Sequence, residues 1–389
     1  MIAGRLKKTS WWLVLSVQFV TVAAPLAVLP FLSLHLQRLS GAGTTDIALW
    51  AAAIAAAPAI GAILSTPLWA RFASSYPLGR LMGLSCLLNA LSAFLQAQAG
   101  TVEIFALGRS IQGLTGIGVL LLLAVEHSRT TRGSGYSGLQ QALAAGCIVG
   151  PLLGGWAFDN DALQGLLTGF AVLLVALSVF CGYAFRDARP VKDEQPSGFA
   201  GLLPPTTTRM LVLSGLLATA GAFGFMPFFA GWALERESAV LTTSLIGLLH
   251  AGSWAAAIVV LPLWRRWIDA GRERAVLRLS TAGSLVALVS LLAGSTVVLI
   301  SLSRILHGAF NSGLAPSLFS VLGRSRHRVA NLAAGRMATT LGQVIGPAIC
   351  GLAVFAAGNN GALFAAALLT LLASILLYLQ PEARSHDVE

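Results

Sequence analysis

The chain has 389 residues, of which 56% are hydrophobic and only 10% are charged. A soluble globular domain has about 25% charged residues, so this composition excludes a water-soluble fold of this length. The formal net charge of +10 at neutral pH has to be explained by where the basic residues lie along the chain.

Apolar runs long enough to cross a bilayer as helices follow one another along the whole chain. The first follows basic residues, as a signal peptide would, but its 26 residues exceed the apolar core of one, so we interpret it as a span. The sequence predicts an all-α polytopic membrane protein with 12 transmembrane helices, at residues 11–36, 46–70, 80–98, 102–126, 137–158, 162–185, 209–233, 240–264, 275–294, 296–322, 329–357 and 361–380.

The Lys and Arg residues lie almost entirely on one side of these spans. Twenty of the 25 fall in the termini and in the breaks after spans two, four, six, eight and ten, whereas Arg38 and Arg236 fall on the other side. Because cytoplasmic loops of membrane proteins are rich in Lys and Arg, both termini are predicted to be cytoplasmic, in a bacterial inner membrane. The basic balance is thus a topology signal, and we expect no nucleic-acid partner.

The chain is an internal duplication. The longest polar stretch, residues 186–208, contains four prolines and is expected to be a cytoplasmic linker between six-helix bundles at 1–185 and 209–389. A shift of 195 residues superimposes rare residue types, namely Pro67-Leu68-Trp69 on Pro262-Leu263-Trp264, Arg109 on Arg304 and Gly113 on Gly308. Two six-span halves around a midplane site are a transporter architecture.

Two motifs carry a resemblance to a known family. Span four contains Arg109-Ser-Ile-Gln112-Gly113-Leu-Thr-Gly116, and span five contains Gly146-x-x-x-Gly150-Pro151-x-x-Gly154-Gly155, with a weaker copy in span eleven. Over essentially the whole chain the sequence resembles the major facilitator superfamily, of the 12-span proton-antiporter type that includes multidrug and siderophore exporters. The resemblance implies secondary active transport by alternating access.

One family motif is altered. The family usually has an aspartate between spans two and three that helps to latch the cytoplasmic gate, and Ser74 stands in its place here, whereas the second half keeps Asp269. Glu126, at the end of span four, is a candidate partner for Arg71 in place of that aspartate. The alternative is that Glu126 is a solvated glutamate at the interface.

Arginines within the spans are the first candidates for substrate contact. An arginine at mid-bilayer costs about 2.5–3.5 kcal/mol on insertion scales, so Arg109 and Arg304 are functional hypotheses, with backbone capping as the alternative. Arg336 is a third candidate, although it can extend to the interface. Helical spacing puts further polar residues on the same faces, namely Gln112 and Gly116 beside Arg109, and His307 and Asn311 beside Arg304.

Spans one, two, seven and eight contain no Asp or Glu at depth, and Glu103 and Glu126 lie near the ends of span four. Because a guanidinium suits carboxylate and phosphate groups, a small organic anion, such as a carboxylate siderophore, or an amphiphilic compound is the predicted cargo. Proton coupling then needs another carrier. His307 is the first candidate because histidine titrates near neutral pH, followed by His250 and Glu126.

Other candidates follow from span position. Gln18 in span one, and Phe225 and Trp232 in span seven, are expected to face the substrate, with packing as the alternative. In span five, Gly146, Gly150, Gly154 and Gly155 permit close helix approach and Pro151 permits bending, so this span is expected to act as a conformational element, with tight packing alone as the alternative.

The leading prediction is a proton-coupled exporter. An organic-anion importer or exchanger is the alternative within transport, and a membrane sensor or scaffold is the alternative of another class. No catalytic set, metal cluster or cofactor motif is recognisable, so we expect no enzyme activity and no cofactor. The four cysteines lie far apart in apolar runs and suit neither disulfides nor a metal. The expected partners are a small-molecule substrate, protons and the lipid bilayer, and a monomer is expected.

Overall fold

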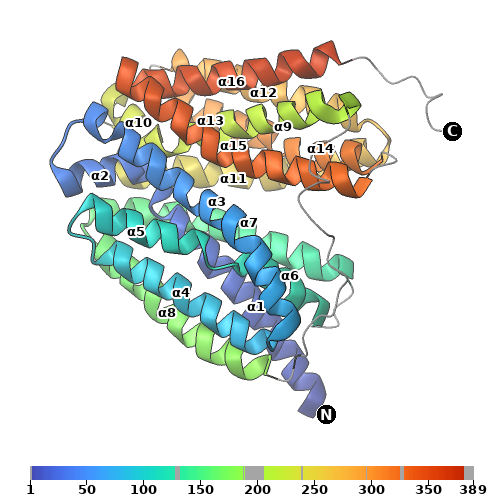
Figure 1. Ribbon diagram of the computed structural model, residues 1–389. Coiled ribbons are helices and arrows are strands. Elements are labelled where there is room, and N and C mark those ends of the chain that lie inside the picture. The colour runs from blue at the N-terminus through green and yellow to red at the C-terminus, as the bar shows by residue number, and fades with distance from the viewer. Residues whose placement is uncertain are drawn as a thin grey trace. The chain divides into compact units, whose positions relative to one another are not determined.

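The computed structural model describes residues 2–127, 132–186, 188, 206–237, 240–294, 296–324 and 328–380. Within these ranges every regular element is a helix (Figure 1). The described residues contain twelve helical segments that are long and apolar enough to cross a membrane. The predicted all-α fold with 12 spans is therefore confirmed. The chain is a multi-pass membrane protein.

Eight of the spans are single helices, and their bounds shift from the predicted ones by a few residues. Span eight, for example, begins at Thr243 and continues to Asp269. These helices are α3 Thr44–Ser75, α4 Leu78–Ala97, α7 Arg132–Asp159, α8 Leu163–Ala184, α11 Thr243–Asp269, α12 Glu273–Leu292, α15 Arg328–Ala357 and α16 Asn359–Leu379.

The other four spans are broken, which the hydropathy pattern does not predict. They are the first and fourth span of each half, so the breaks follow the duplication. Span one is α1 Ile2–Leu26, η1 Leu29–Phe31 and α2 Leu32–Ser40; span four is α5 Val102–Gly113 and α6 Ile117–His127; span seven is α9 Thr206–Gly224, η3 Met226–Phe228 and α10 Phe229–Glu237; span ten is α13 Val297–Asn311 and α14 Leu314–Gly323.

Local sequence explains where these breaks occur. Pro30 and Pro227 sit in the short 3-10 turns of spans one and seven, where a missing backbone N–H and a restricted preceding residue interrupt an α-helix. In span four, Gly116 has a φ of 63°, in the left-handed region that favours glycine, and α6 begins one residue later.

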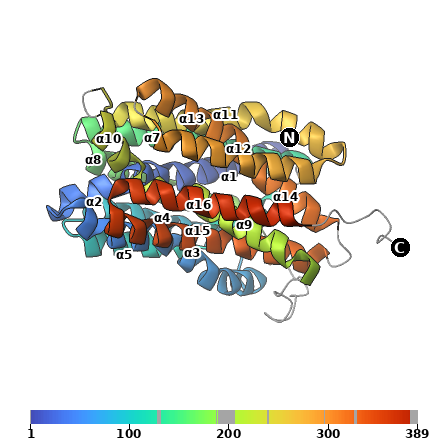
Figure 2. The ribbon, with the colours of Figure 1, turned by 90° about the horizontal axis from the view of Figure 1, so that it is seen from above.

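The contacts divide the chain into two compact units. The first comprises residues 1–196 and 227–251, and the second comprises residues 197–226 and 252–389. In the first unit α4 packs against α8 and α5, and α1 packs against α7. In the second unit the repeat-equivalent helices do the same, because α12 packs against α16 and α13, and α9 packs against α15. Figure 2 shows α16 beside α12 and α9, as the contacts require.

Candidate functional site

The break in span four is held by side chains from two neighbouring spans. The Trp69 indole N–H donates to the Leu114 carbonyl at 2.8 Å, and the Ser85 hydroxyl donates to the Thr115 carbonyl at 2.7 Å. A carbonyl freed from a helix inside a membrane needs such a donor because no lipid can supply one. Side-chain hydrogen bonds therefore stabilise the non-helical turn that follows Arg109 in span four.

Span ten repeats this arrangement in the second half. The Trp264 indole N–H donates to the Ala309 carbonyl at 3.0 Å and to the Ser312 hydroxyl at 3.1 Å. Trp264 lies 195 residues after Trp69, so the two tryptophans are equivalent in the repeat. They also make equivalent hydrogen bonds at the two helix breaks. The repeated Pro-Leu-Trp sequence is thus explained by two equivalent broken spans.

The glycine that follows the arginine motif brings two spans into backbone contact. A Cβ at Gly113 would overlap the Pro58 carbonyl, and a Cβ at Gly308 would overlap the Ser253 carbonyl. Pro58 and Ser253 are again 195 residues apart. Spans four and ten are therefore each in close backbone contact with a neighbouring span, one helical turn after the arginine candidate.

Arg109 is buried in the first unit, with 3% of its surface exposed. Its Nη1 donates to Gln112 Oε1 at 2.8 Å, which orients both side chains on the predicted face of α5. Gln112 lines a cavity of about 10 Å³, the space of about one water molecule, together with side chains of α1, α4 and α8. The polar residues that share this cavity are Thr21, Asn89, Ser92 and Gln96.

The α4 side of this cavity is a polar stripe that the sequence analysis missed. Asn89, Ser92 and Gln96 are all buried, and the Gln96 side-chain amide donates to the Ser92 hydroxyl at 3.0 Å. Their spacing of three and four residues inside an apolar span was the available signal, because it puts them on one helix face. The Arg109 motif thus has a polar partner surface within its own half.

In the second unit the equivalent face is also buried. Arg304 and His307 have 7% and 5% of their surface exposed. His307 and Asn311 line a narrow seam, with no room for a water molecule, together with Ser280, Thr281, Ser284 and Thr370. His307 Nε2 is buried without a hydrogen-bond partner among the described residues. Ser284 and His307 are the repeat equivalents of Asn89 and Gln112, so both halves place polar groups at the same junction.

The other predicted substrate residues are dispersed. Gln18 is half-buried in α1, where its carbonyl accepts from the Thr21 hydroxyl at 3.2 Å. Phe225 and Trp232 are buried, with 2% and 1% of their surface exposed, and the Trp232 ring stacks on Phe229 at 6.2 Å. Arg336 is exposed on α15. Substrate contact by these residues stays a prediction.

The glycine motif of span five has two packing directions. A Cβ at Gly146 or Gly150 would overlap α1, and a Cβ at Gly154 would overlap the Ala27 carbonyl just after α1. A Cβ at Gly155 would instead overlap the Thr243 carbonyl of α11. The helix α7 continues unbroken through Pro151. The glycines therefore allow two different spans to approach α7 closely; the conformational role of the motif stays a prediction.

The basic face is formed by the ends of the spans that carry most basic residues. Its described part includes an ion pair between the buried Glu273 and the half-exposed Arg324, which the sequence analysis missed. Glu273 Oε1 lies 2.9 Å from Arg324 Nη1, and the Glu273 side chain is 9% exposed. Asp269 lies 3.9 Å from Arg265, and both side chains are largely exposed. Glu273 occupies the first turn of α12, where the free N–H groups favour an acid, and this position was the signal available in the sequence.

The proposed substitute latch of the first half is only partly described. Arg71 is exposed, and its carbonyl accepts from the Ser74 hydroxyl at 2.7 Å. The side chain of Glu126 lies outside the described part of the chain. The pairing of Arg71 with Glu126 stays a prediction. His250, another proton-coupling candidate, is buried in α11 with 1% of its surface exposed.

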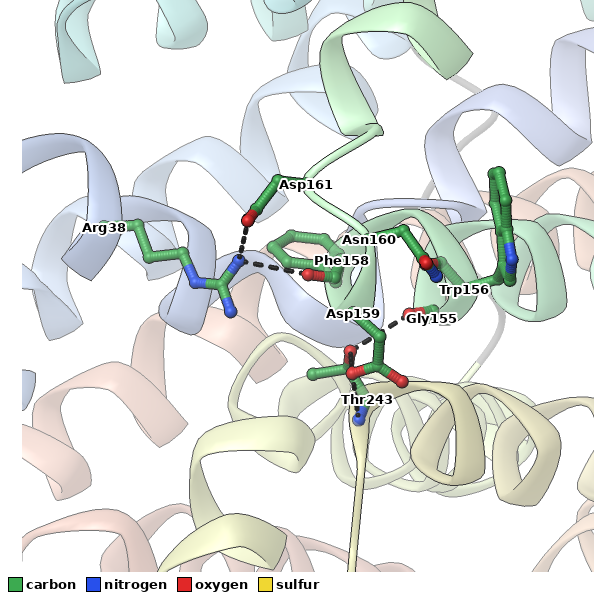
Figure 3. Close-up of polar contacts among 8 residues, drawn as sticks. All are labelled: Arg38, Gly155, Trp156, Phe158, Asp159, Asn160, Asp161 and Thr243. Atoms are coloured by element: carbon green, nitrogen blue, oxygen red, sulfur yellow. Dashed lines mark hydrogen bonds and ion pairs between the residues drawn. The ribbon is translucent and has the colours of Figure 1, made fainter.

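A second polar cluster lies at the far end of α7, opposite the basic face (Figure 3). Asp159 accepts hydrogen bonds from the first residues of α11, and Asp161 lies 3.5 Å from Arg38 Nη1. Arg38 Nη1 also donates to the Phe158 carbonyl at 3.3 Å, and its guanidinium lies 5.4 Å from the Phe158 ring centre. Both aspartates lie between predicted spans five and six, and the sequence analysis gave them no role.

Comparisons with known proteins agree with this architecture. The family model described as Major Facilitator Superfamily matches residues 11–234 and 211–389. The Staphyloferrin B transporter of Staphylococcus aureus is 26% identical over 325 residues, covering 80% of this chain and 77% of its own length. The multidrug resistance protein MdtG of Yersinia enterocolitica is 23% identical over 362 residues, covering 89% and 86%.

Solved structures share the fold. A bacterial homologue of the human lysosomal transporter Spinster, inward-facing and unoccupied, superimposes with a TM-score of 0.81 at 10% identity and covers 96% of this chain and 97% of its own. The human organic anion transporter MFSD10 has a TM-score of 0.69 at 19% identity, covering 96% and 99%. With a family model matched along nearly its whole length and two six-span halves, the chain belongs to the Major Facilitator Superfamily of transporters.

Proposed function

We propose that the chain exports a small organic anion in exchange for protons by alternating access, in a bacterial inner membrane with both termini in the cytoplasm. The observation that carries the proposal is Arg109. Its guanidinium is buried at a helix break, and within the described residues it has no acidic partner. A buried cation of this kind is a site for an anion.

The chemistry of arginine supports an anionic cargo. A guanidinium has five N–H donors and stays charged at every physiological pH. Gln112 accepts from Nη1, and Arg109 Nε has no acceptor among the described residues. A carboxylate that reaches this group supplies both the missing acceptors and the opposite charge, which offsets the cost of keeping arginine away from water.

Arg304 extends the argument to the second half. It is buried at the position equivalent to Arg109, about two turns before the end of α13 at Asn311. Two buried cations suit a cargo with more than one carboxylate. Discontinuous helices in transporter halves commonly hold substrates near the midplane.

The names of the relatives support a small-molecule cargo. They include the Staphyloferrin B transporter and the multidrug resistance protein MdtG. The complete glycine motif of span five, which resembles that of antiporters in the family, favours export coupled to protons. His307 is our proposed proton carrier, because it shares the face of Arg304 and its Nε2 has no hydrogen-bond partner among the described residues. His250 and Glu126 are the alternatives.

Inverted membrane vesicles with an acidic lumen test the proposal. Radiolabelled citrate represents a polycarboxylate and ethidium represents a cationic drug. We expect saturable citrate uptake that a protonophore abolishes, and no ethidium uptake. Citrate uptake that is insensitive to the protonophore would contradict proton coupling. Ethidium uptake without citrate uptake would contradict an anionic cargo.

Variants then connect the result to Arg109. Arg109→Gln should lower citrate uptake about tenfold or more, because the cargo loses a buried charged partner. Arg109→Lys should retain part of the uptake, since it keeps the charge without the planar fork. Arg80→Gln is the matched control, because Arg80 is exposed on the first turn of α4. Equal uptake in Arg109→Gln and Arg80→Gln would contradict the role of Arg109.

A further inference from the structure

The first turn of α11 is capped by a carboxylate from another span. Thr243 N donates to Asp159 Oδ1 at 3.0 Å (Figure 3). Ser244 N donates to Asp159 Oδ2 at 2.8 Å. The Thr243 hydroxyl also donates to Asp159 Oδ1. The first N–H groups of a helix have no partner within it and carry a partial positive charge, so one carboxylate satisfies two of them at once.

The capped helix end is also in backbone contact with α7. The Thr243 hydroxyl lies 3.0 Å from the Gly155 carbonyl, and Thr243 has only 4% of its surface exposed. A Cβ at Gly155 would overlap the Thr243 carbonyl, and a Cβ at Gly247 would overlap the Pro151 carbonyl. The α7–α11 crossing is therefore too tight for any side chain larger than glycine at positions 155 and 247. The Asp159 carboxylate binds α11 at the end of this crossing.

This crossing joins the two halves of the duplication. Helix α7 is span five of the first half and α11 is span eight, in the second half. By contacts, however, residues 227–251 belong to the same compact unit as residues 1–196. The beginning of α11 is thus packed with the first half in the conformation that the structure shows. Alternating access moves one half against the other, so the α7–α11 contact has to open in one part of the cycle.

We propose that Asp159 is the gate residue that holds the two halves together at the face opposite the basic one. Its carboxylate closes this face by binding the N-terminus of α11, and the face opens when Thr243 and Ser244 leave it. In the orientation proposed above, this is the outer gate. A cargo therefore leaves on this side only after these hydrogen bonds break, whatever its chemistry.

Asp161 provides the matched contrast. It lies two residues further on and is also an acid in a polar contact, 3.5 Å from Arg38 with 94% of its side chain exposed. Arg38 belongs to α2, which is part of the first half, as α7 is. The Arg38–Asp161 pair therefore stays within one half throughout the transport cycle and does not connect the two halves.

Distance measurements between two spin labels test the proposal. The labels replace Gln164 at the start of α8 and Leu248 in the second turn of α11, both exposed on helices. The four native cysteines are buried, so the two introduced thiols are the accessible ones. The full-length protein is measured in lipid nanodiscs without cargo by double electron–electron resonance.

Asp159→Ala should raise the ratio of long to short distances about tenfold, because charge-assisted hydrogen bonds to a helix end are lost. Asp159→Asn should give a smaller rise, since the amide keeps one acceptor oxygen. Asp161→Ala should match the wild type. A wild-type distribution in Asp159→Ala would overturn the proposal, as would an equal rise in Asp161→Ala. Elution as a single folded species verifies each variant, and Asp159→Asn decides the question if Asp159→Ala fails to fold. The measurement needs no substrate, so it stands or fails separately from the proposed cargo.

Discussion

Trp69 and Trp264 occupy equivalent positions in the two halves, and each indole N–H donates to a backbone carbonyl at the break of the neighbouring span, at 2.8 Å and 3.0 Å. The two tryptophans therefore have the same role. Each supplies a hydrogen-bond donor to a carbonyl that would otherwise be unsatisfied where a helix ends inside the bilayer. The arginine and histidine candidates lie on the turns that precede these breaks, so the tryptophans indirectly position them.

Trp69→Phe should lower the free energy of unfolding by about 1–3 kcal/mol, because the Leu114 carbonyl, which is freed from the helix inside the membrane, loses this donor. The measurement is the thermal unfolding midpoint in detergent. Trp156→Phe is the control, since Trp156 has 53% of its surface exposed. Equal midpoints for the two variants would show that the indole hydrogen bond contributes nothing.

Gly113→Ala should destabilise the protein by about 1–3 kcal/mol, because the added methyl group overlaps the Pro58 carbonyl and pushes two spans apart. Gly118→Ala is the matched control in the same span, with no atom within 4 Å of the added methyl group. That variant should be neutral or more stable by about 0.5–1 kcal/mol, as alanine favours a helix. The thermal midpoints of both variants decide the prediction, and a stable Gly113→Ala would contradict it.

His307→Gln should abolish the pH dependence of cargo uptake in inverted vesicles, because glutamine keeps polar atoms in the seam beside Ser284 but binds no proton. His250→Gln is the comparison and should keep the pH profile of the wild type. A lower rate with an unchanged pH profile in His307→Gln would assign His307 to packing. The proton would then pass through another group.

Glu273→Gln should lower the free energy of unfolding by about 1–3 kcal/mol, because a buried carboxylate loses its bond to Arg324 and its attraction to the N-terminus of α12. Asp269→Asn, four residues earlier, should change it by less than about 0.5 kcal/mol, since the Arg265–Asp269 pair is exposed. Chemical or thermal unfolding of both variants, side by side, measures the difference. A larger effect in Asp269→Asn would contradict this assignment.

Hydropathy alone predicts the 12 spans because a bilayer imposes a minimum length of apolar helix on each of them. It does not predict that α5 ends at Gly113 and α6 begins at Ile117, because both helices lie within one continuous apolar segment. The break depends on whether a donor such as Trp69 reaches the freed carbonyl, and that donor comes from another span. Gly116 favours the break locally, and residues far apart in the chain stabilise it.

The candidate site shows the same division. Arg109 and Gln112 were predicted on one helix face from their spacing, and the hydrogen bond between them at 2.8 Å agrees. The buried partners Asn89 and Ser92 were missed, because small polar residues in a span carry no strong signal until the helices pack. Asp159 lies just after predicted span five, and its role was missed because the Ser244 N–H that it binds at 2.8 Å lies 85 residues later in the chain.

By itself, the sequence determined that the protein spans a membrane, that it is duplicated and that it carries cations inside its spans, because length, hydropathy and repeated residues are local properties. Only the tertiary structure decided which carbonyls are freed, which polar groups meet in the seams and which helix end Asp159 binds. The physical reason is that a hydrogen bond needs its two partners within about 3 Å in space, and chain distance does not determine that.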